Sequence, residues 1–266
     1  MKIHKTAIVD EKAQVGADVE IGPYTIIGAG AIIGEKSVIQ SHVVIEGSVV
    51  MGTGNFVGHG AIIGAAPQDL SFNLETHSGV RIGNDNIIRE YCTIHRGTAE
   101  GSMTTLGAKN FLMVGAHVGH NCNIGNNVII ANNCLLGGYV EIQDNAFLGG
   151  GCVFHQFVRV GRLAITQGGS AFSVHIPPFV MAALLNYAIG LNVIGLKRAG
   201  FTGKERDELK AAFKLLYTSG LNRNQALERA AESKWGAPAQ EFFDFVASAK
   251  KRGICAYRGN DRKLAD

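Results

Sequence analysis

The stretch "VEIGPYTIIGAGAIIGEKSVIQSHVVIEG" (residues 19–47) decides the fold, because an aliphatic side chain returns in it every six residues. This register runs from Ile3 to Ile63, resumes at Ile82 and, after a second break, continues to Val160. A period of six fits neither an amphipathic helix nor a half-buried strand, whose periods are 3.6 and 2. Small or β-branched residues stand two positions before most of the aliphatic ones, and Gly often follows them. The repeat therefore predicts a parallel β-helix, in which each hexad forms one short strand and one corner.

The breaks and the end of the repeat define the expected domains. Residues 65–80 and 97–105 leave the register, so we expect them to form loops outside the coil, where functional residues often lie. Two prolines in "HIPPFV" end the repeat near residue 180. We expect a β-helix domain over residues 1–190 and a helical C-terminal domain over 191–266.

The C-terminal region has helical periodicity. A capping box, Thr202 with Glu205, begins a helix that ends at Gly220 and has one apolar face. A second helix is expected at about 223–233, and a third from about Pro238, and the tail after Gly253 is expected to be loosely ordered. The apolar face of the first helix consists of Leu209, Ala212, Phe213 and Leu216.

Composition limits the class of protein. The 266 residues are 46% hydrophobic and only 18% charged, and they include 35 glycines. The first residues lack the apolar core of a signal peptide, and the most apolar segment, 179–196, contains asparagines that argue against stable membrane insertion. Five cysteines form no C-x-x-C pair, which favours reduced thiols and a cytoplasmic protein. Nothing in the sequence suggests a nucleic-acid partner.

Charge is concentrated at the C-terminal end. Residues 197–266 hold 15 of the 25 Lys and Arg residues and 9 of the 22 Asp and Glu residues, a local balance of +6. Such an end can bind phosphates or an acidic partner, although a solvated helical surface would have the same composition.

Two histidines of "GAHVGHNCNIGN" (115–126) are the main candidates for chemistry. In the hexad register Val118 points inward, so His117 and His120 occupy positions outside the core. An imidazole can accept a proton near neutral pH, which suits a general base. A structural or solvated role stays open from the residues alone.

The order of motifs resembles the UDP-N-acetylglucosamine O-acyltransferase family over nearly the whole chain. That family has hexapeptide repeats, a left-handed β-helix and a trimeric assembly with a site between neighbouring subunits. The matching segments are "PQDL" (67–70), "IREYCTIHRGT" (88–98), "NFLMVGAHVGHNC" (110–122), "HQF" (155–157), "IPPFV" (176–180) and "GLKRAGF" (195–201).

The resemblance implies a reaction and its residues. His120 would be the general base that removes the proton of the sugar 3-hydroxyl, and the oxygen would attack the thioester of a (3-hydroxy)acyl carrier protein. The backbone N–H of Gly138 would stabilise the oxyanion. This is the first step of lipid A biosynthesis, and it needs no metal and no further cofactor. The residues implied to contact substrate are Gln68, Asp69, His117, His155, Gln156, Gly168, Asn192 and Arg198, of which Arg198 would meet the diphosphate and Gly168 would set chain length.

Four positions and one segment depart from the family pattern, the segment being "ALLNY" (183–187), which stands where the family has "QGNxA". Ser71 stands where a lysine is usual, and Asn121 follows His120 where an aspartate is usual. Tyr139 replaces a common histidine, and Ile194 replaces a carboxylate. These departures leave open the acceptor sugar, O- against N-acylation, acyl-chain length and the use of coenzyme A as donor.

Other classes share the β-helix. A γ-type carbonic anhydrase also has a motif similar to "VGHNC", but it places a second histidine five residues later, where this chain has Gly125. A coenzyme A-dependent sugar acetyltransferase and a non-catalytic scaffold are further alternatives.

Overall fold

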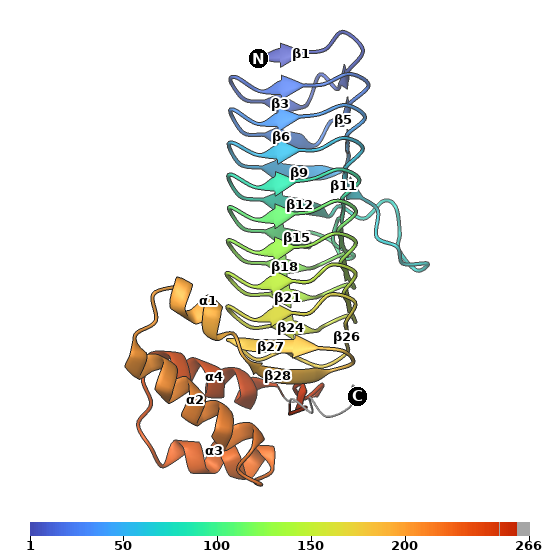
Figure 1. Ribbon diagram of the computed structural model, residues 1–266. Coiled ribbons are helices and arrows are strands. Elements are labelled where there is room, and N and C mark those ends of the chain that lie inside the picture. The colour runs from blue at the N-terminus through green and yellow to red at the C-terminus, as the bar shows by residue number, and fades with distance from the viewer. Residues whose placement is uncertain (250, 260–266) are drawn as a thin grey trace, which may run out of the picture.

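The computed structural model describes residues 1–249 and 251–259, and the chain begins in it as a tall coil of very short strands (Figure 1). Most strands are two residues long, and the second residue of each points into the coil. From Ile21 to Val160 every aliphatic residue of the six-residue register is buried, which confirms the predicted repeat. Only the first positions, beginning with Ile3, are partly exposed, because no earlier coil covers them.

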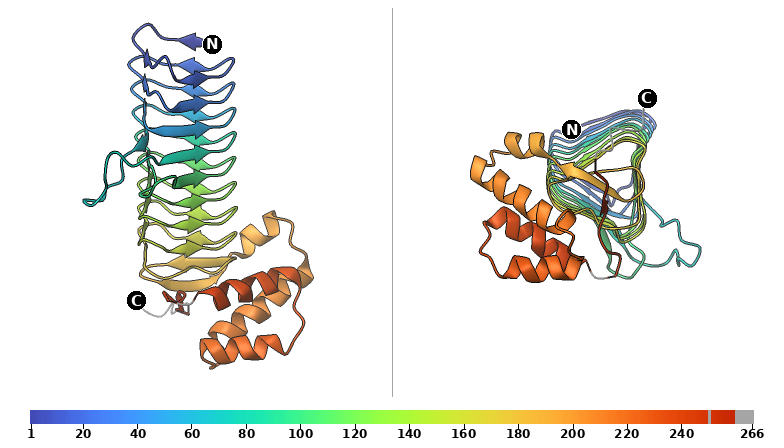
Figure 2. Two further views of the ribbon diagram at one scale, coloured as in Figure 1. Left: turned by 180° about the vertical axis from the view of Figure 1, so that it is seen from behind. Right: turned by 60° about the horizontal axis from the view of Figure 1, so that its bottom comes forward.

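The strands stack into three sheets that give the coil a triangular cross-section (Figure 2). Sheet A contains β1 (Lys2–Ile3), β4 (Glu20–Ile21), β7 (Val38–Ile39), β10 (Phe56–Val57), β13 (Ile87–Ile88), β16 (Phe111–Leu112), β19 (Ile129–Ile130), β22 (Phe147–Leu148), β25 (Ile165–Thr166), β27 (Val180–Ala183), β28 (Tyr187–Leu191) and β29 (Ala256–Tyr257). Sheet B contains β2 (Ile8–Val9), β5 (Ile26–Ile27), β8 (Val44–Ile45), β11 (Ile62–Ala65), β14 (Thr93–His95), β17 (His117–Val118), β20 (Leu135–Leu136), β23 (Val153–Phe154) and β26 (Ala171–Phe172). Sheet C contains β3 (Gln14–Val15), β6 (Ala31–Ile33), β9 (Ser48–Met51), β12 (Gly79–Ile82), β15 (Met103–Leu106), β18 (Asn123–Ile124), β21 (Glu141–Ile142) and β24 (Arg159–Val160).

The interior also contains a ladder of buried asparagines. The side-chain N–H of Asn86 donates to Oδ1 of Asn55 over 2.9 Å, and the backbone N–H of Asn110 donates to Oδ1 of Asn86 over 2.9 Å. The backbone N–H of Val128 completes the ladder by donating to Oδ1 of Asn110 over 2.7 Å. A buried amide is costly unless it is hydrogen-bonded. The ladder therefore lets polar residues occupy the second inward position of a hexad.

The chain passes in turn along three edges, named here the A/B, B/C and C/A edges after the sheets that they join. Most corners need one residue with a left-handed backbone, and asparagine tolerates this conformation well. Asn121, Asn127, Asn133 and Asn145 are examples, with φ between 54° and 60°. Both predicted loops leave the B/C edge, between β11 and β12 and between β14 and β15. Figure 1 shows the longer one projecting far from the coil.

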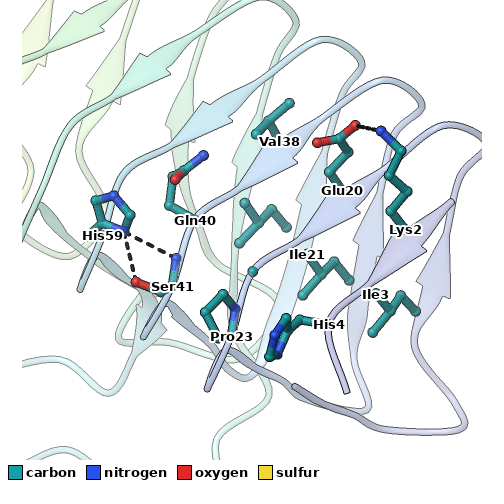
Figure 3. A pocket seen from close by; sticks show the side chains of 12 residues that line it. Lys2, Ile3, His4, Glu20, Ile21, Pro23, Val38, Gln40, Ser41 and His59 are labelled. Carbon is teal, nitrogen blue, oxygen red and sulfur yellow. Dashed lines mark hydrogen bonds and ion pairs between the residues drawn. The ribbon is translucent and has the colours of Figure 1, made fainter. Parts of the chain in front are cut away.

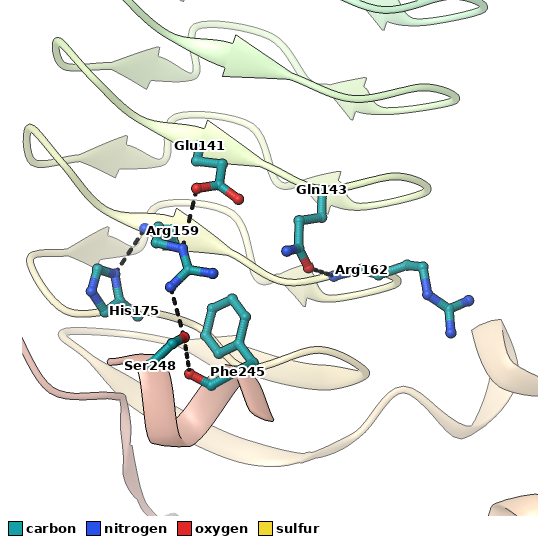
Figure 4. Close-up of polar contacts among 7 residues, drawn as sticks. All are labelled: Glu141, Gln143, Arg159, Arg162, His175, Phe245 and Ser248. Atoms are coloured by element: carbon teal, nitrogen blue, oxygen red, sulfur yellow. Dashed lines mark hydrogen bonds and ion pairs between the residues drawn. The ribbon is translucent and has the colours of Figure 1, made fainter. Parts of the chain in front are cut away.

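Four helices of the described chain follow the coil: α1 (Val193–Arg198), α2 (Gly203–Tyr217), α3 (Arg223–Ala231) and α4 (Ala237–Ser248). The capping box of Thr202 and Glu205 is present at the start of α2, as predicted. Helix α4 is joined to sheet C by Arg159, whose Nε contacts Glu141 Oε2 over 3.2 Å and whose Nη1 donates to Ser248 Oγ over 2.9 Å (Figure 4). The same guanidinium lies over the Phe245 ring.

The structure differs from the expected organisation in five places. Each loop ends earlier than expected, because β12 begins at Gly79 and β15 at Met103. Strand pairing also continues after the prolines, since β27 pairs in parallel with β25 and antiparallel with β28. Helix α1 was not expected. The prediction of a loosely ordered tail after Gly253 was wrong for residues 254–259, because β29 pairs with β28. Residues 260–266 lie outside the described chain.

Candidate active site

His120 lies at a corner of the B/C edge. Its Nδ1 is 3.0 Å from Oδ1 of Asn121, which occupies the left-handed position of the corner with φ of 58°. The ring of Tyr139 meets the imidazole edge-on, with centroids 5.3 Å apart and an interplanar angle of 88°. Tyr139 in turn stacks on Phe157 at 4.7 Å. The imidazole is thus held by one polar neighbour and one aromatic neighbour.

Gly138 lies one coil further along, directly against the same imidazole. A methyl group at this position would overlap the ring of His120, so glycine is required for the close approach. In the described residues, the backbone N–H of Gly138 donates no hydrogen bond to the protein. A donor in this position, beside a proton-accepting histidine, can stabilise an oxyanion formed next to the imidazole.

His117 occupies the outer face of β17, on the same edge. Its Nδ1 is 2.8 Å from Oγ1 of Thr93, and its ring meets His95 edge-on at 5.1 Å. Burial, with a smaller effect of the nearby His95, lowers the pKa of His117 to about 4. His117 is therefore neutral at physiological pH and suits hydrogen bonding to a ligand.

The loop over residues 66–78 brings Asp69 to this edge. Oδ1 of Asp69 accepts hydrogen bonds from Oγ and N of Ser71, at 2.7 and 2.9 Å. These bonds lower the pKa of the Asp69 carboxyl, and a smaller contribution in the same direction comes from His120. Gln68 is exposed beside it.

The loop is fixed at its base by the protein itself. Arg96 lies over the ring of Phe72 and donates to the carbonyl oxygen of Leu74 over 3.3 Å. His95 Nδ1 is 2.7 Å from the carbonyl oxygen of Ala66, so this nitrogen carries the proton. These contacts fix the loop that carries Gln68 and Asp69 to the B/C edge of the coil.

The remaining residues of the B/C edge follow one coil after Gly138. His155 and Gln156 are both exposed, and Nδ1 of His155 is 3.3 Å from the carbonyl oxygen of Gln156. The structure thus brings seven of the ten residues implied by the family resemblance to one edge. They are Gln68, Asp69, His117, His120, His155 and Gln156, together with Gly138.

Three other predicted residues lie elsewhere on the chain. Gly168 is on the A/B edge, where a Cβ would come within 3.0 Å of the Gly150 carbonyl oxygen. Asn192 caps α1 by accepting from Gly195 N over 2.9 Å. Arg198, exposed at the end of α1, lines with Asn192 a hollow of about 760 Å³ at the C/A edge. Within one chain, therefore, these residues do not lie at the edge that carries His120.

The hollow beside α1 is largely apolar. Its floor is formed by outward residues of sheet A, namely Phe147, Ile165 and Met181, and Ile194 contributes to its wall. Arg198 and Asn192 supply polar groups at its rim. This composition suits a flat ligand with a phosphate at one end.

Another hollow lies on the first coils, where it is lined by residues between Lys2 and His59 (Figure 3). Its charged and polar groups pair within the chain: Lys2 Nζ lies 2.7 Å from Glu20 Oε1, and Ser41 Oγ lies 2.8 Å from His59 Nδ1.

Within residues 1–249 and 251–259, no three His, Cys, Asp or Glu side chains gather closely enough to hold a metal ion. The same ranges include no helix with the length and apolar character needed to cross a bilayer.

Sequence reasoning missed two residues of the edge. Thr98, in the shorter loop, donates from both its N and its Oγ1 to Oδ1 of Asn121, each over 3.0 Å. Its Oγ1 is also 3.1 Å from the hydroxyl of Tyr139, which the sequence showed only as a departure. The one available signal was that the shorter loop leaves the same edge as His120.

Solved structures with the same fold are acyltransferases. The UDP-N-acetylglucosamine acyltransferase of Francisella novicida superimposes with a TM-score of 0.91 at 37% identity, covering 97% of this chain and 95% of that one. The enzyme from Campylobacter jejuni gives 0.90 at 37% identity, covering 97% of this chain and all of the other. These similarities confirm the left-handed β-helix with a helical C-terminal part.

Sequence relatives agree with the structures. A family model described as "Udp N-acetylglucosamine O-acyltransferase; Domain 2" matches residues 176–255, and one described as "Bacterial transferase hexapeptide (six repeats)" matches 103–138. The acyl-[acyl-carrier-protein]–UDP-N-acetylglucosamine O-acyltransferase of Burkholderia orbicola is 46% identical over 261 residues, covering 95% of this chain and 98% of the relative. The Synechocystis relative of the same name is 44% identical over 187 residues, covering 70% of this chain and 67% of its own. The chain therefore belongs to the acyl-[acyl-carrier-protein]–UDP-N-acetylglucosamine O-acyltransferase family.

Proposed function

We propose that the protein transfers a (3-hydroxy)acyl chain from acyl carrier protein to the 3-hydroxyl of UDP-N-acetylglucosamine, the step that begins lipid A biosynthesis. Membership of the family supports the reaction. The observation that carries the proposal is the pairing of His120 with the backbone N–H of Gly138 at one edge of the coil, because it combines a proton acceptor with an oxyanion donor.

In this reaction His120 removes the proton of the sugar hydroxyl, and the oxygen attacks the thioester carbonyl carbon. The tetrahedral intermediate carries its negative charge beside the N–H of Gly138. When it collapses, the C–S bond breaks and the imidazolium returns its proton to the carrier thiolate, so charge and protons balance. A positioned base contributes about 10²–10⁴-fold to such a step.

A trimer would complete the site. The outward rows of sheets A and B are mostly apolar, whereas the outward row of sheet C becomes polar from Arg81 onward. Large apolar faces on a protein surface indicate contact with another protein. The outward row of sheet A includes Val38, Phe56, Ile87, Phe111, Ile129, Phe147, Ile165 and Met181, and that of sheet B includes Ile8, Ile26, Val44, Ile62, Leu135, Val153 and Ala171.

Packing sheet A of one subunit on sheet B of the next places the C/A edge of the first beside the B/C edge of the second. Asn192 and Arg198 of one subunit would then face His117 and His120 of its neighbour. Arg198 would bind the diphosphate, a role that suits the guanidinium fork. Gln68 and Asp69 would contact the sugar.

The acyl chain would lie along the outer surface of sheet B. Leu135 and Val153 are exposed apolar side chains between the His120 edge and Gly168, at 44% and 42% exposure. Such a track would hold an extended alkyl chain, and Gly168, at its far edge, leaves room for the chain end. The basic C-terminal helices would receive the acidic carrier protein.

The test is transfer of a labelled acyl group to a panel of UDP-sugars. We expect transfer from 3-hydroxyacyl carrier protein to UDP-N-acetylglucosamine, and loss of about 10²–10⁴-fold in His120→Ala with the assembly intact. His4→Ala, which changes an exposed histidine on the first coil, is the control. Preference for the 3-amino analogue or for acyl-coenzyme A would identify a diverged acyltransferase, and near-normal turnover in His120→Ala would refute the assignment of the base.

A further inference from the structure

A chain of hydrogen bonds runs from the imidazole of His120 through Asn121 to the shorter loop. His120 Nδ1 lies 3.0 Å from Asn121 Oδ1, and that oxygen also accepts from the N and Oγ1 of Thr98, each over 3.0 Å. The Oγ1 of Thr98 is 3.1 Å from the hydroxyl of Tyr139. Four residues from the coil and the shorter loop thus form one connected network.

The backbone N–H of Thr98 determines how the Asn121 amide is oriented. A side-chain amide could turn by 180° and exchange its oxygen with its nitrogen, and the two atoms are difficult to distinguish from shape alone. A backbone N–H is always a donor, so the atom that receives it must be the oxygen. This same oxygen faces His120, and it has no hydrogen to donate. Nδ1 of His120 is therefore the donor and carries the proton.

The direction of the remaining bonds follows. Because the hydroxyl hydrogen of Thr98 is used on Asn121, the contact between Thr98 and Tyr139 must be donated by the tyrosine. The phenol ring is itself fixed, edge-on against His120 and stacked on Phe157. The guanidinium of Arg252 lies over the other ring of that stack, 5.7 Å from the centroid of Phe157.

We propose that Thr98 and Tyr139 are positioning residues that hold His120 in the tautomer protonated at Nδ1, which leaves Nε2 as the proton acceptor. The inference rests on the proposed function only in that His120 is the base. A carboxylate beside a histidine would select this tautomer by charge, whichever oxygen faced the ring. An amide selects it only in one of its two orientations. The orientation of the Asn121 amide therefore depends on Thr98 and Tyr139. An aspartate at the same position would select the tautomer without them.

The first test measures this dependence in turnover. Thr98→Val removes the hydroxyl but keeps the backbone N–H, and we expect kcat to fall about 3- to 10-fold with the KM of both substrates changed less than about twofold. Thr98→Ser should retain the rate. Tyr139→Phe, which keeps the ring, should cost about two- to threefold. Thr105→Val is the matched control, since Thr105 Oγ1 donates to Asn123 Oδ1 over 2.7 Å on sheet C and not at the B/C edge.

The second test asks whether a carboxylate makes the network dispensable. In an Asn121→Asp background, adding Thr98→Val should change kcat less than about twofold. An equal loss in both backgrounds would mean that Thr98 acts through the fold of the loop, and would overturn the inference.

The third test observes the tautomer without turnover. In the intact protein labelled with ¹⁵N-histidine, and with His120→Ala used to assign the signal, Nε2 of His120 should have the chemical shift of an unprotonated nitrogen. Thr98→Val removes the hydroxyl donor and leaves the backbone N–H of residue 98 alone to hold the Asn121 oxygen, so the two ring nitrogens should move part of the way toward a mixture of tautomers. A protonated Nε2 in the neutral wild-type ring would refute the inference even if His120 is the base. Conversely, turnover in His120→Ala would refute the proposed base and leave the tautomer assignment standing.

Discussion

The B/C and C/A edges are made from the same hexads, yet they differ in how regular they are. The C/A edge is closed by short turns that repeat from coil to coil, with Asn126 and Asp144 hydrogen-bonded to each other across successive coils. The B/C edge is interrupted by two loops and contains His120 and His155. A repeating edge satisfies its own polar groups, whereas an interrupted edge leaves groups that can bind or react.

The two edges also acquire function differently. On the B/C edge the residues of the proposed chemistry, His120 and Gly138, belong to the coil itself, and two loops leave the coil beside them. On the C/A edge the coil supplies an apolar floor, and the polar groups come from α1, which lies beside it. Changes to His120 or Gly138 at the first edge should therefore affect the chemical step, and changes to Arg198 at the second should affect binding.

The strongest test of this difference is Gly138→Ala. The backbone at Gly138 is not left-handed, so alanine is compatible with its conformation, but the new methyl group would overlap the His120 ring. A displacement of about 1 Å in a catalytic group can cost about 10²-fold, and we expect a loss of this size in kcat. Gly203→Ala, where a Cβ would meet nothing within 4 Å, is the control. Wild-type kcat in Gly138→Ala would show that the contact is unimportant for the reaction.

Arg198→Met should have a smaller effect, and it should affect substrate binding instead of the chemical step. The variant keeps much of the side-chain length but loses the charge, so the KM for the UDP-sugar should rise about 10-fold while kcat changes little. Initial rates over a range of UDP-sugar at saturating acyl donor measure both. Lys204→Met, on α2, controls for loss of positive charge in the same region. A fall in kcat alone would place Arg198 with the chemistry and contradict the division between the edges.

Much of the B/C edge could be read from the six-residue period. Three hexads complete one coil, so residues 18 apart stack on each other, as His117 and Leu135 do. The same spacing places Gly138 against His120 and Gln156 beyond Gly138. The inward aliphatic register from Ile21 to Val160 follows from the sequence for the same reason.

The parts that could not be predicted lie outside the repeat. Thr98 reaches Asn121 because its loop folds back, and no register relates the two positions. The hairpin of β27 and β28 depends on left-handed backbone at Leu184 and Asn186, and an exposed leucine gives no signal for it. Helix α1 is only six residues long, too short for a clear helical period, and is fixed by the Asn192 cap.

The smallest expected effect concerns the acid stability of the protein and a histidine that lies at neither edge. His175 lies where the coil meets α4, and its Nδ1 accepts the backbone N–H of Arg159 over 3.0 Å, while its ring is edge-on to Phe245 (Figure 4). Burial, helped by Arg159 and Arg252, lowers the pKa of His175 to about 4. In the unfolded chain an ordinary histidine binds its proton near pH 6.5.

The unfolded state therefore takes up this proton first as the pH falls, and the stability present above about pH 6.5 is lost progressively down to about pH 4. His175→Asn keeps an acceptor for Arg159 but does not titrate, so its Tm should fall less than that of the wild type between pH 7 and pH 4.5, by roughly 2–4 °C. Its kcat at pH 7 should equal that of the wild type, because the residue is part of the junction and not of the B/C edge.

His117 also has a lowered pKa, near 4, but it lies beside the B/C edge, so His117→Asn should change both the acid sensitivity and the turnover. Scanning calorimetry at the two pH values, together with the transfer assay, separates the two histidines, and a loss of turnover in His175→Asn would connect the junction to the reaction.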